Sequence, residues 1–360
     1  MDDFSTNRYA GNTMKQEPSH SGPFVNKHPD LWFEDGNIVI MAGDFFFNVH
    51  QGVLCRHSVP LTEAIDALKG DDKYARFLEG NIVLELDDNP KDLSPFLMAL
   101  YDGVSHVKHN SQDFEIVSSI LRLATKYAVE HVRNDILRGM SAIWPRNLSA
   151  WEFREADATD TTGVYKPRSI YPHPILVINL AKETGANELL PSAFYDLSRC
   201  AASEIATGYL PQGSSDRSQM HVLSDECLLN ALRGREHASR FLSTFVVNEL
   251  EGREPSQNCT HKNDTDPFRK RICQATFEAT TFEILRDVNG VVFHRSSDPL
   301  FAIMDADLMQ TRTDSTRLNL LHRACEACRL EFTASVDAAR EEMWHKLPLW
   351  FGITDLQSWP

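Results

Sequence analysis

Four cysteines are the side chains in this sequence whose type and spacing could do chemistry. Cys325 and Cys328 are three residues apart, so a helix or a tight turn would point both sulfurs to one side, while Cys259 and Cys273 flank a loop further upstream. Four thiolates can hold a zinc ion in a tetrahedral site. The pattern therefore predicts a structural zinc that joins the loop to the helix.

The same cysteines have a second interpretation. Cysteine is often used as a small buried hydrophobe, and 51 residues separate the two pairs, of which only the second has ligand-like spacing. His261 and His322 lie in the same segments and could replace a cysteine as ligand. The chain has seven cysteines, an odd number that does not suggest a disulfide framework and favours a reducing compartment.

The elements that must position such side chains begin with a predicted hairpin. Residues 38 to 42 are a β-branched run, Gly43 and Asp44 have the composition of a tight turn, and residues 45 to 49 form a second apolar run. His50 follows at the point where this strand enters a short helix. The sequence therefore predicts the order strand, strand, helix.

A third strand is predicted over residues 82 to 87, followed by a helix over residues 96 to 103 that ends in Leu-Tyr-x-Gly. Gly103 has no Cβ and can take the left-handed conformation that closes a helix. Residues 114 to 127 then repeat apolar side chains at three- and four-residue spacing, which predicts another helix.

This order of elements resembles the BTB/POZ domain family over residues 28 to 141. A weaker likeness, over residues 174 to 250 and 318 to 352, is to the tails of a large group of fungal BTB proteins. The resemblance implies a small sheet with surrounding helices that acts by self-association, as a homodimer, or by binding an adaptor. The residues that carry it are Asp35, His50, Val53, Leu54, Ser58, Leu61, Tyr101, Gly103, Ala124 and Tyr127.

The predicted fold class is α+β. We expect a disordered arm over residues 1 to 26, a BTB/POZ domain over 27 to 144, a loop-like linker over 145 to 173, and a mostly α-helical C-terminal domain over 174 to 360. The helices of the last domain are predicted from periodicity and from glycine stops.

Composition narrows the class of protein. The 36 basic and 51 acidic residues give a formal charge of −15, which repels phosphate backbones and argues against direct binding to nucleic acid. No apolar stretch approaches the roughly 20 residues that span a bilayer, and the first residues lack the apolar core of a signal peptide. A cytoplasmic or nuclear protein is expected.

Two features bear on how a BTB domain would act. BTB adaptors of cullin-based ubiquitin ligases carry an apolar-x-Glu element before the third strand, and here Phe77 and Glu79 occupy that place. The alternative is that Phe77 packs on the domain and Glu79 is solvated.

The residue after His50 is basic in many BTB proteins, and with an upstream Asp it lines a charged pocket. Here that residue is Gln51, so the pocket that Asp35 would complete lacks the expected cation.

The sequence contains no nucleophile elbow, phosphate-binding glycine loop, dinucleotide fingerprint or helical zinc-protease motif. The acidic pair Asp87 and Asp88 precedes a helix, where negative charge stabilises the helix N-terminus. We expect a non-catalytic protein-interaction protein with no cofactor beyond the possible zinc. The alternatives are a substrate adaptor that binds a cullin scaffold and a transcriptional regulator without direct DNA binding.

Overall fold

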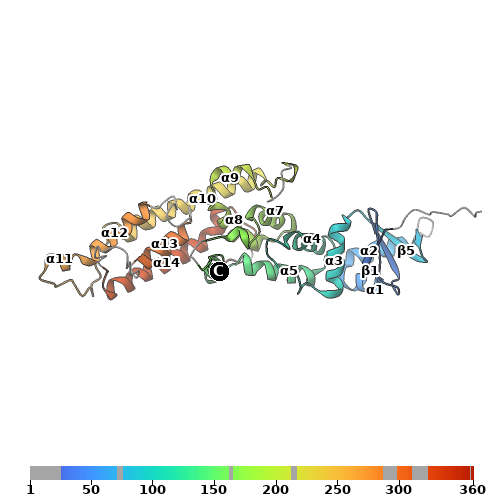
Figure 1. Ribbon diagram of the computed structural model, residues 1–360, viewed down its shortest axis with the longest axis horizontal. Coiled ribbons are helices and arrows are strands. Elements are labelled where there is room, and N and C mark those ends of the chain that lie inside the picture. The colour runs from blue at the N-terminus through green and yellow to red at the C-terminus, as the bar shows by residue number, and fades with distance from the viewer. Residues whose placement is uncertain are drawn as a thin grey trace, which may run out of the picture. The chain divides into compact units, whose positions relative to one another are not determined.

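The chain folds into a mixed α+β structure, as the sequence predicts. The computed structural model describes residues 26–70, 76–161, 165–211, 217–286, 298–309, 323–356 and 358–360. These described residues form one five-stranded sheet and fourteen α-helices (Figure 1).

The sheet has the order β1-β3-β2-β5-β4. Strands β2 and β3 form the predicted antiparallel hairpin, and Gly43 takes a positive φ of 52° in its turn. Strand β5 runs parallel to β2, and β1 runs parallel to β3 at the sheet edge, where Pro29 is tolerated because an edge strand can spare a backbone donor. The strands are β1 (Asn26–Trp32), β2 (Ile38–Ala42), β3 (Phe45–Val49), β4 (Phe77–Leu78) and β5 (Asn81–Leu86).

Three helix boundaries lie where the local sequence predicts them. Ser224 caps α10 by accepting a hydrogen bond from the Cys227 N–H at 3.3 Å, and Gly103 and Gly185 close α3 and α7 with φ values of 71° and 68°. The helices are α1 (Gln51–His57), α2 (Val59–Gly70), α3 (Pro90–Asp102), α4 (Phe114–Lys126), α5 (Glu130–Ile143), α6 (Leu148–Asp157), α7 (Pro174–Thr184), α8 (Leu190–Ser198), α9 (Ala202–Thr207), α10 (Asp225–Phe245), α11 (Pro267–Lys270), α12 (Ile272–Arg286), α13 (Pro299–Met309) and α14 (Glu326–Trp350), with short turns η1 (Pro167–Ser169), η2 (Asn187–Leu189), η3 (Arg217–Gln219) and the π-helical η4 (Val246–Leu250).

The chain divides into two compact units. The first contains the sheet, from residues up to 52 and from 64 to 90; the second contains residues 53–63 and those from 91 onward. Helices α3, α4 and α5, which we expected within the N-terminal domain, belong to the second unit. The boundaries at 144 and 174 stay a prediction.

The segment predicted as a loop between domains contains a helix. The Asn147 side chain accepts a hydrogen bond from the Ala150 N–H at 2.8 Å and so caps α6, and Leu148 and Trp151 on this helix are buried. The loop prediction is therefore wrong over α6, where burial of apolar side chains outweighs the turn-rich composition that follows.

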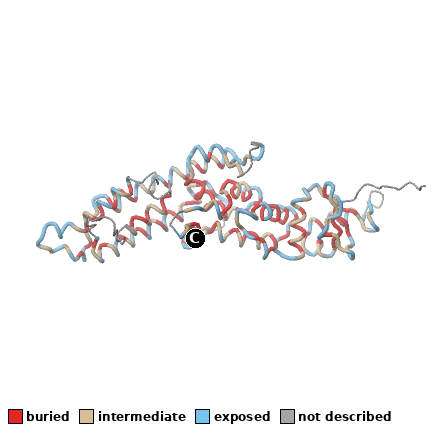
Figure 2. The backbone as a smooth tube through the Cα atoms, in the orientation of Figure 1, coloured by how far each residue is buried: buried red, intermediate tan, exposed pale blue. Residues whose placement is uncertain are grey.

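Helices α10, α13 and α14 of the second unit pack side by side (Figure 1), and Figure 2 marks their inward faces as buried. Near the end of α14, the Trp344 Nε1–H donates to the Arg146 carbonyl at 2.8 Å, and the Trp359 ring stacks on Trp344 with centroids 5.5 Å apart. Gly234 allows Phe351 to pack on α10, because a Cβ at this position would lie 1.9 Å from the Phe351 ring. None of the helices in the described part of the chain combines the length and apolar character that a bilayer span needs.

The Gly234 contact gives a stability prediction. Gly234→Ala should destabilise the protein by about 1 to 3 kcal/mol, because the added methyl overpacks a rigid aromatic contact. Gly52→Ala is the matched control, since open space surrounds that position in α1 and alanine is the better helix former. Urea unfolding followed by circular dichroism measures both. Equal effects of the two substitutions would contradict the packing role of Gly234.

Candidate functional site

The four cysteines converge from separate elements of the second unit. Cys259 lies in the loop after η4, Cys273 is the second residue of α12, and Cys325 is at the N-cap position of α14, whose first turn contains Cys328. Their four sulfur atoms all lie within 4.8 Å of one another. The structure therefore brings together two pairs that are separated by 51 intervening residues in the sequence.

Two of the sulfur separations fit a tetrahedral metal site. Cys259 Sγ lies 3.7 Å from Cys273 Sγ and 3.8 Å from Cys325 Sγ. A tetrahedron built on the usual zinc–sulfur bond of about 2.3 Å has edges of about 3.8 Å. All four cysteines are free thiols.

Backbone donors and helix ends surround the sulfurs. The Ser256 N–H donates to Cys328 Sγ at 3.3 Å, and the Cys325 N–H donates to Cys273 Sγ at 3.2 Å. The N-termini of α12 and α14 both meet at the cluster, and the positive ends of helix dipoles favour thiolates. The surroundings therefore supply hydrogen bonds that stabilise metal-bound thiolates.

The thiols differ in acidity. Burial would raise the pKa of Cys325, but hydrogen bonds from the N–H groups of Cys328 and Thr260 lower it to about 6. Burial raises the pKa of Cys273 to about 11 and also raises that of Cys328. A metal that binds all four sulfurs must therefore displace protons at neutral pH.

The cluster also forms part of an apolar core. Cys259, Cys273 and Cys328 are buried together with large side chains that include Phe245, Leu250, Phe277 and Phe332. The geometry therefore also agrees with the second interpretation, in which these cysteines are small buried core residues. His261 is not a member of the sulfur group, and His322 lies outside the described residues.

His50 lies, as predicted, where β3 enters α1. Its Nε2 is 3.2 Å from Asp35 Oδ1, and its ring centroid is 5.1 Å from that of Phe33. The next residue, Gln51, contacts a lysine of α2, because Lys69 Nζ donates to Gln51 Oε1 at 2.8 Å. Position 51 therefore has a basic partner although it is not itself basic.

The other signature residues serve the packing of the chain. Ser58 Oγ donates to the Tyr127 carbonyl at 2.7 Å and accepts from the Leu61 N–H at 3.1 Å. The Tyr127 ring stacks on Phe96 with centroids 5.7 Å apart. Leu54, Leu61, Ala124 and Tyr127 are buried, Val53 and Tyr101 are half-buried, and Gly103 is the helix stop described above.

Phe77 and Glu79 lie at the short β4–β5 hairpin. The Phe77 side chain is 63% exposed, so it does not pack into the domain. Glu79 takes a positive φ of 52°, and its carboxylate pairs with Lys27 Nζ at 2.5 Å. An exposed aromatic side chain therefore lies two residues from an acid held by a salt bridge.

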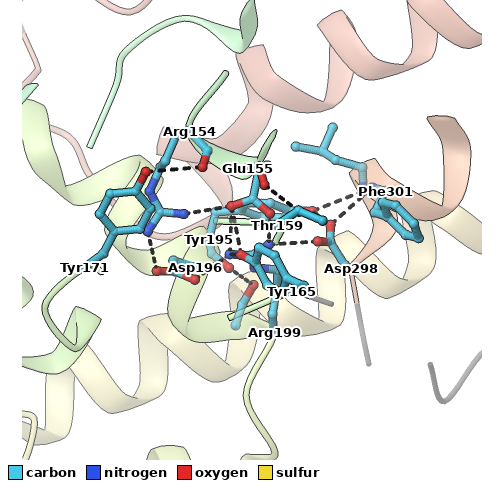
Figure 3. Close-up of polar contacts among 12 residues, drawn as sticks. Arg154, Glu155, Thr159, Tyr165, Tyr171, Tyr195, Asp196, Arg199, Asp298 and Phe301 are labelled. Carbon is cyan, nitrogen blue, oxygen red and sulfur yellow. Dashed lines mark hydrogen bonds and ion pairs between the residues drawn. The ribbon is translucent and has the colours of Figure 1, made fainter. Parts of the chain in front are cut away.

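A buried charge cluster is the feature that the sequence analysis missed (Figure 3). It combines three guanidinium groups with three carboxylates in the second unit, and Figure 3 shows the tyrosines 165, 171 and 195 around it. Its charged members are Arg154, Glu155, Arg168, Asp196, Arg199 and Asp298.

Asp196 contacts all three arginines of the cluster. It is fully buried and pairs with Arg154 at 2.8 Å, Arg168 at 2.8 Å and Arg199 at 2.5 Å. Burial alone would raise its pKa, but the three guanidinium groups hold that pKa well below its usual range. Arg154 also lies over the rings of Trp144 and Trp151, at 4.7 and 4.6 Å.

Arg199 links Glu155 of α6 to the start of α13. It donates to Glu155 at 2.7 Å and to Asp298 at 2.8 Å, and Asp298 accepts from the Phe301 N–H at the start of α13. Glu155 and Asp298 line a pocket of about 170 Å³ whose other walls include Trp151 and Leu300. Because Arg199 lowers the pKa of Asp298 against the effect of burial, this carboxylate is not a general acid near neutral pH.

No protein-family model matches this chain, and no curated protein matches it either.

The charge cluster should make stability depend on acid pH. Asp196 and Asp298 have lowered folded-state pKa values, so their contribution is fully present above the ordinary value of 3.8 and is lost as the pH falls below it. Asp298→Asn should cost about 3 kcal/mol at neutral pH, since it leaves Arg199 short of a carboxylate, and should make the acid decline shallower. Thermal unfolding between pH 6 and pH 2 measures both.

Glu236→Gln is the matched control for that experiment. Glu236 pairs with Arg240 on the exposed face of α10, so its loss should change the stability by less than about 0.5 kcal/mol. If Asp298→Asn behaved like this control, or if its decline in acid matched that of the parent protein, the cluster would not hold α13.

Proposed function

We propose that this chain is a non-catalytic protein-interaction protein that acts through a BTB/POZ-like N-terminal region. The supporting observation is the element order: hairpin β2–β3, His50, α1, α2, strand β5, α3 ending at Gly103, then α4 and α5. This order is the one on which the resemblance to the BTB/POZ family rests. Self-association is the mode of action that the resemblance implies.

A second proposal, a cullin adaptor, has a specific observation in its favour. An anchor that enters a groove on a partner must be accessible in the free protein, and Phe77 is 63% exposed. Glu79, two residues further on, pairs with Lys27. The hairpin would therefore present an accessible aromatic side chain and a nearby acid to a cullin scaffold.

We also infer that Cys259, Cys273, Cys325 and Cys328 hold one structural zinc ion. The support is the match of two sulfur separations to a tetrahedral site, together with amide donors and two helix N-termini. Bound zinc would join the loop after η4 to the starts of α12 and α14. Its role would be to stabilise the second unit rather than to take part in a reaction.

Native mass spectrometry of the reduced, full-length chain tests the main proposal. At about 10 μM we expect a dimer with one zinc per chain, and a strong chelator should remove the zinc and lower the melting temperature. Cys328→Ser should lose the metal, whereas Cys55→Ser, which changes a cysteine outside the cluster, should retain it. A monomer would contradict self-association, and a metal-free dimer would contradict only the zinc site.

The adaptor proposal predicts a dependence on Phe77. Titration of a cullin N-terminal domain by calorimetry should detect binding, and Phe77→Ala should weaken it at least tenfold, which is about 1.4 kcal/mol. Phe282→Ala removes an equally exposed phenylalanine, 64% exposed on α12, and should leave the affinity unchanged. Absence of binding by the parent chain, or equal loss in both variants, would rule out an adaptor of this type.

A further inference from the structure

The four cysteines of the proposed zinc site are unequal in accessibility. Cys259, Cys273 and Cys328 are buried, with 7%, 0% and 2% of their surface exposed, whereas Cys325 is only partly buried. Cys325 also occupies the N-cap of the 25-residue helix α14, whose positive end favours a negatively charged sulfur. A small oxidant arriving from solvent would therefore reach the sulfur of Cys325 before the other three.

A second sulfur is already in place beside Cys325. Cys259 Sγ lies 3.8 Å away, on a residue 66 positions earlier in the chain. Because Cys259 belongs to a loop, it can move the remaining distance to a disulfide bond of about 2.05 Å more easily than Cys273 or Cys328, which belong to helices. The geometry favours a bond between the loop and the start of α14.

We propose that Cys325 is a site of oxidation by hydroperoxides, and that its oxidation forms a Cys259–Cys325 disulfide and expels the zinc. This inference rests on the zinc site proposed above. It adds a chemical class of co-reactant, the hydroperoxides, and a means of regulating the metal.

The steps balance in atoms and electrons. The Cys325 sulfur attacks one peroxide oxygen, the O–O bond breaks, and a sulfenic acid forms as hydroxide leaves. The Cys259 thiolate then attacks that sulfur, the S–O bond breaks, and a second hydroxide leaves as the disulfide forms. Two electrons pass from the sulfurs to the peroxide, and the two hydroxides take up protons to give water. Cys273 and Cys328 alone cannot complete a four-coordinate site, so zinc leaves as the hydrated ion.

The experiment starts from the full chain, purified in the presence of a reductant. Its zinc content is measured by elemental mass spectrometry. A protein without zinc would contradict the metal site itself. Zinc-loaded protein is then treated with hydrogen peroxide, zinc release is followed with a colorimetric chelator, and disulfides are mapped by peptide mass spectrometry. We expect one zinc released per chain together with a Cys259–Cys325 bond, and recovery of the site after reduction with zinc present.

Two variants make the assignment specific. Cys325→His keeps a zinc ligand but removes the accessible thiolate, so zinc release by peroxide should slow at least tenfold. Cys200→Ser removes another partly buried cysteine that lies outside the cluster and should leave the release rate unchanged. Zinc retained by the parent under peroxide, a disulfide that excludes Cys259 or Cys325, or equal release rates in the parent and Cys325→His would each overturn the proposal.

Discussion

Two buried guanidinium groups, together with a third that is partly exposed, impose the strictest constraint on this structure. Moving a single charge out of water costs several kcal/mol, which only a well-placed counter-charge with hydrogen bonds can offset. Asp196 meets that requirement by contacting three arginines at once, although it is wholly buried. The positions of α6, α8, η1 and the start of α13 are therefore coupled, because moving any of them would leave a charge without its partner.

The cysteine group presents the opposite electrostatic problem. The charge cluster contains as many cations as anions, so the chain itself balances its charges. Four ionised cysteines would instead bring four negative charges within 4.8 Å of one another, and the compensation that the described residues supply consists of amide dipoles and helix ends. A full set of thiolates is therefore stable only with a bound cation, and without one most of the sulfurs keep their protons.

The features that could be predicted from the sequence are those that depend on interactions between residues close together in the chain. The β2–β3 hairpin, the stop at Gly103 and the cap at Ser224 depend on neighbouring residues, and each was predicted correctly. Strand β1, with a proline inside it, and the two-residue strand β4 carry too little local pattern to be found.

The sites divide in the same way. The convergence of the cysteines was predicted because their residue type limits the possible partners, although the sequence could not decide between a metal and a core. The charge cluster was missed because its ion pairs join residues such as Arg199 and Asp298, 99 positions apart, and arginines and acids are too common for such pairs to stand out. A run of tryptophan and tyrosine around Arg154 was the available signal, since buried cations often lie over aromatic rings.

The hydrogen bond from Trp344 to the Arg146 carbonyl joins two parts of the chain that are synthesised at different times. The two residues are 198 positions apart. At the usual pace of translation, residues near Arg146 would leave the ribosome about 10 to 40 s before the helix that covers them. During that interval the ring of Trp151, which lies against Trp344 of α14 and is buried in the finished protein, has no α14 against which to pack. The nascent chain therefore exposes that apolar surface until α14 has been synthesised.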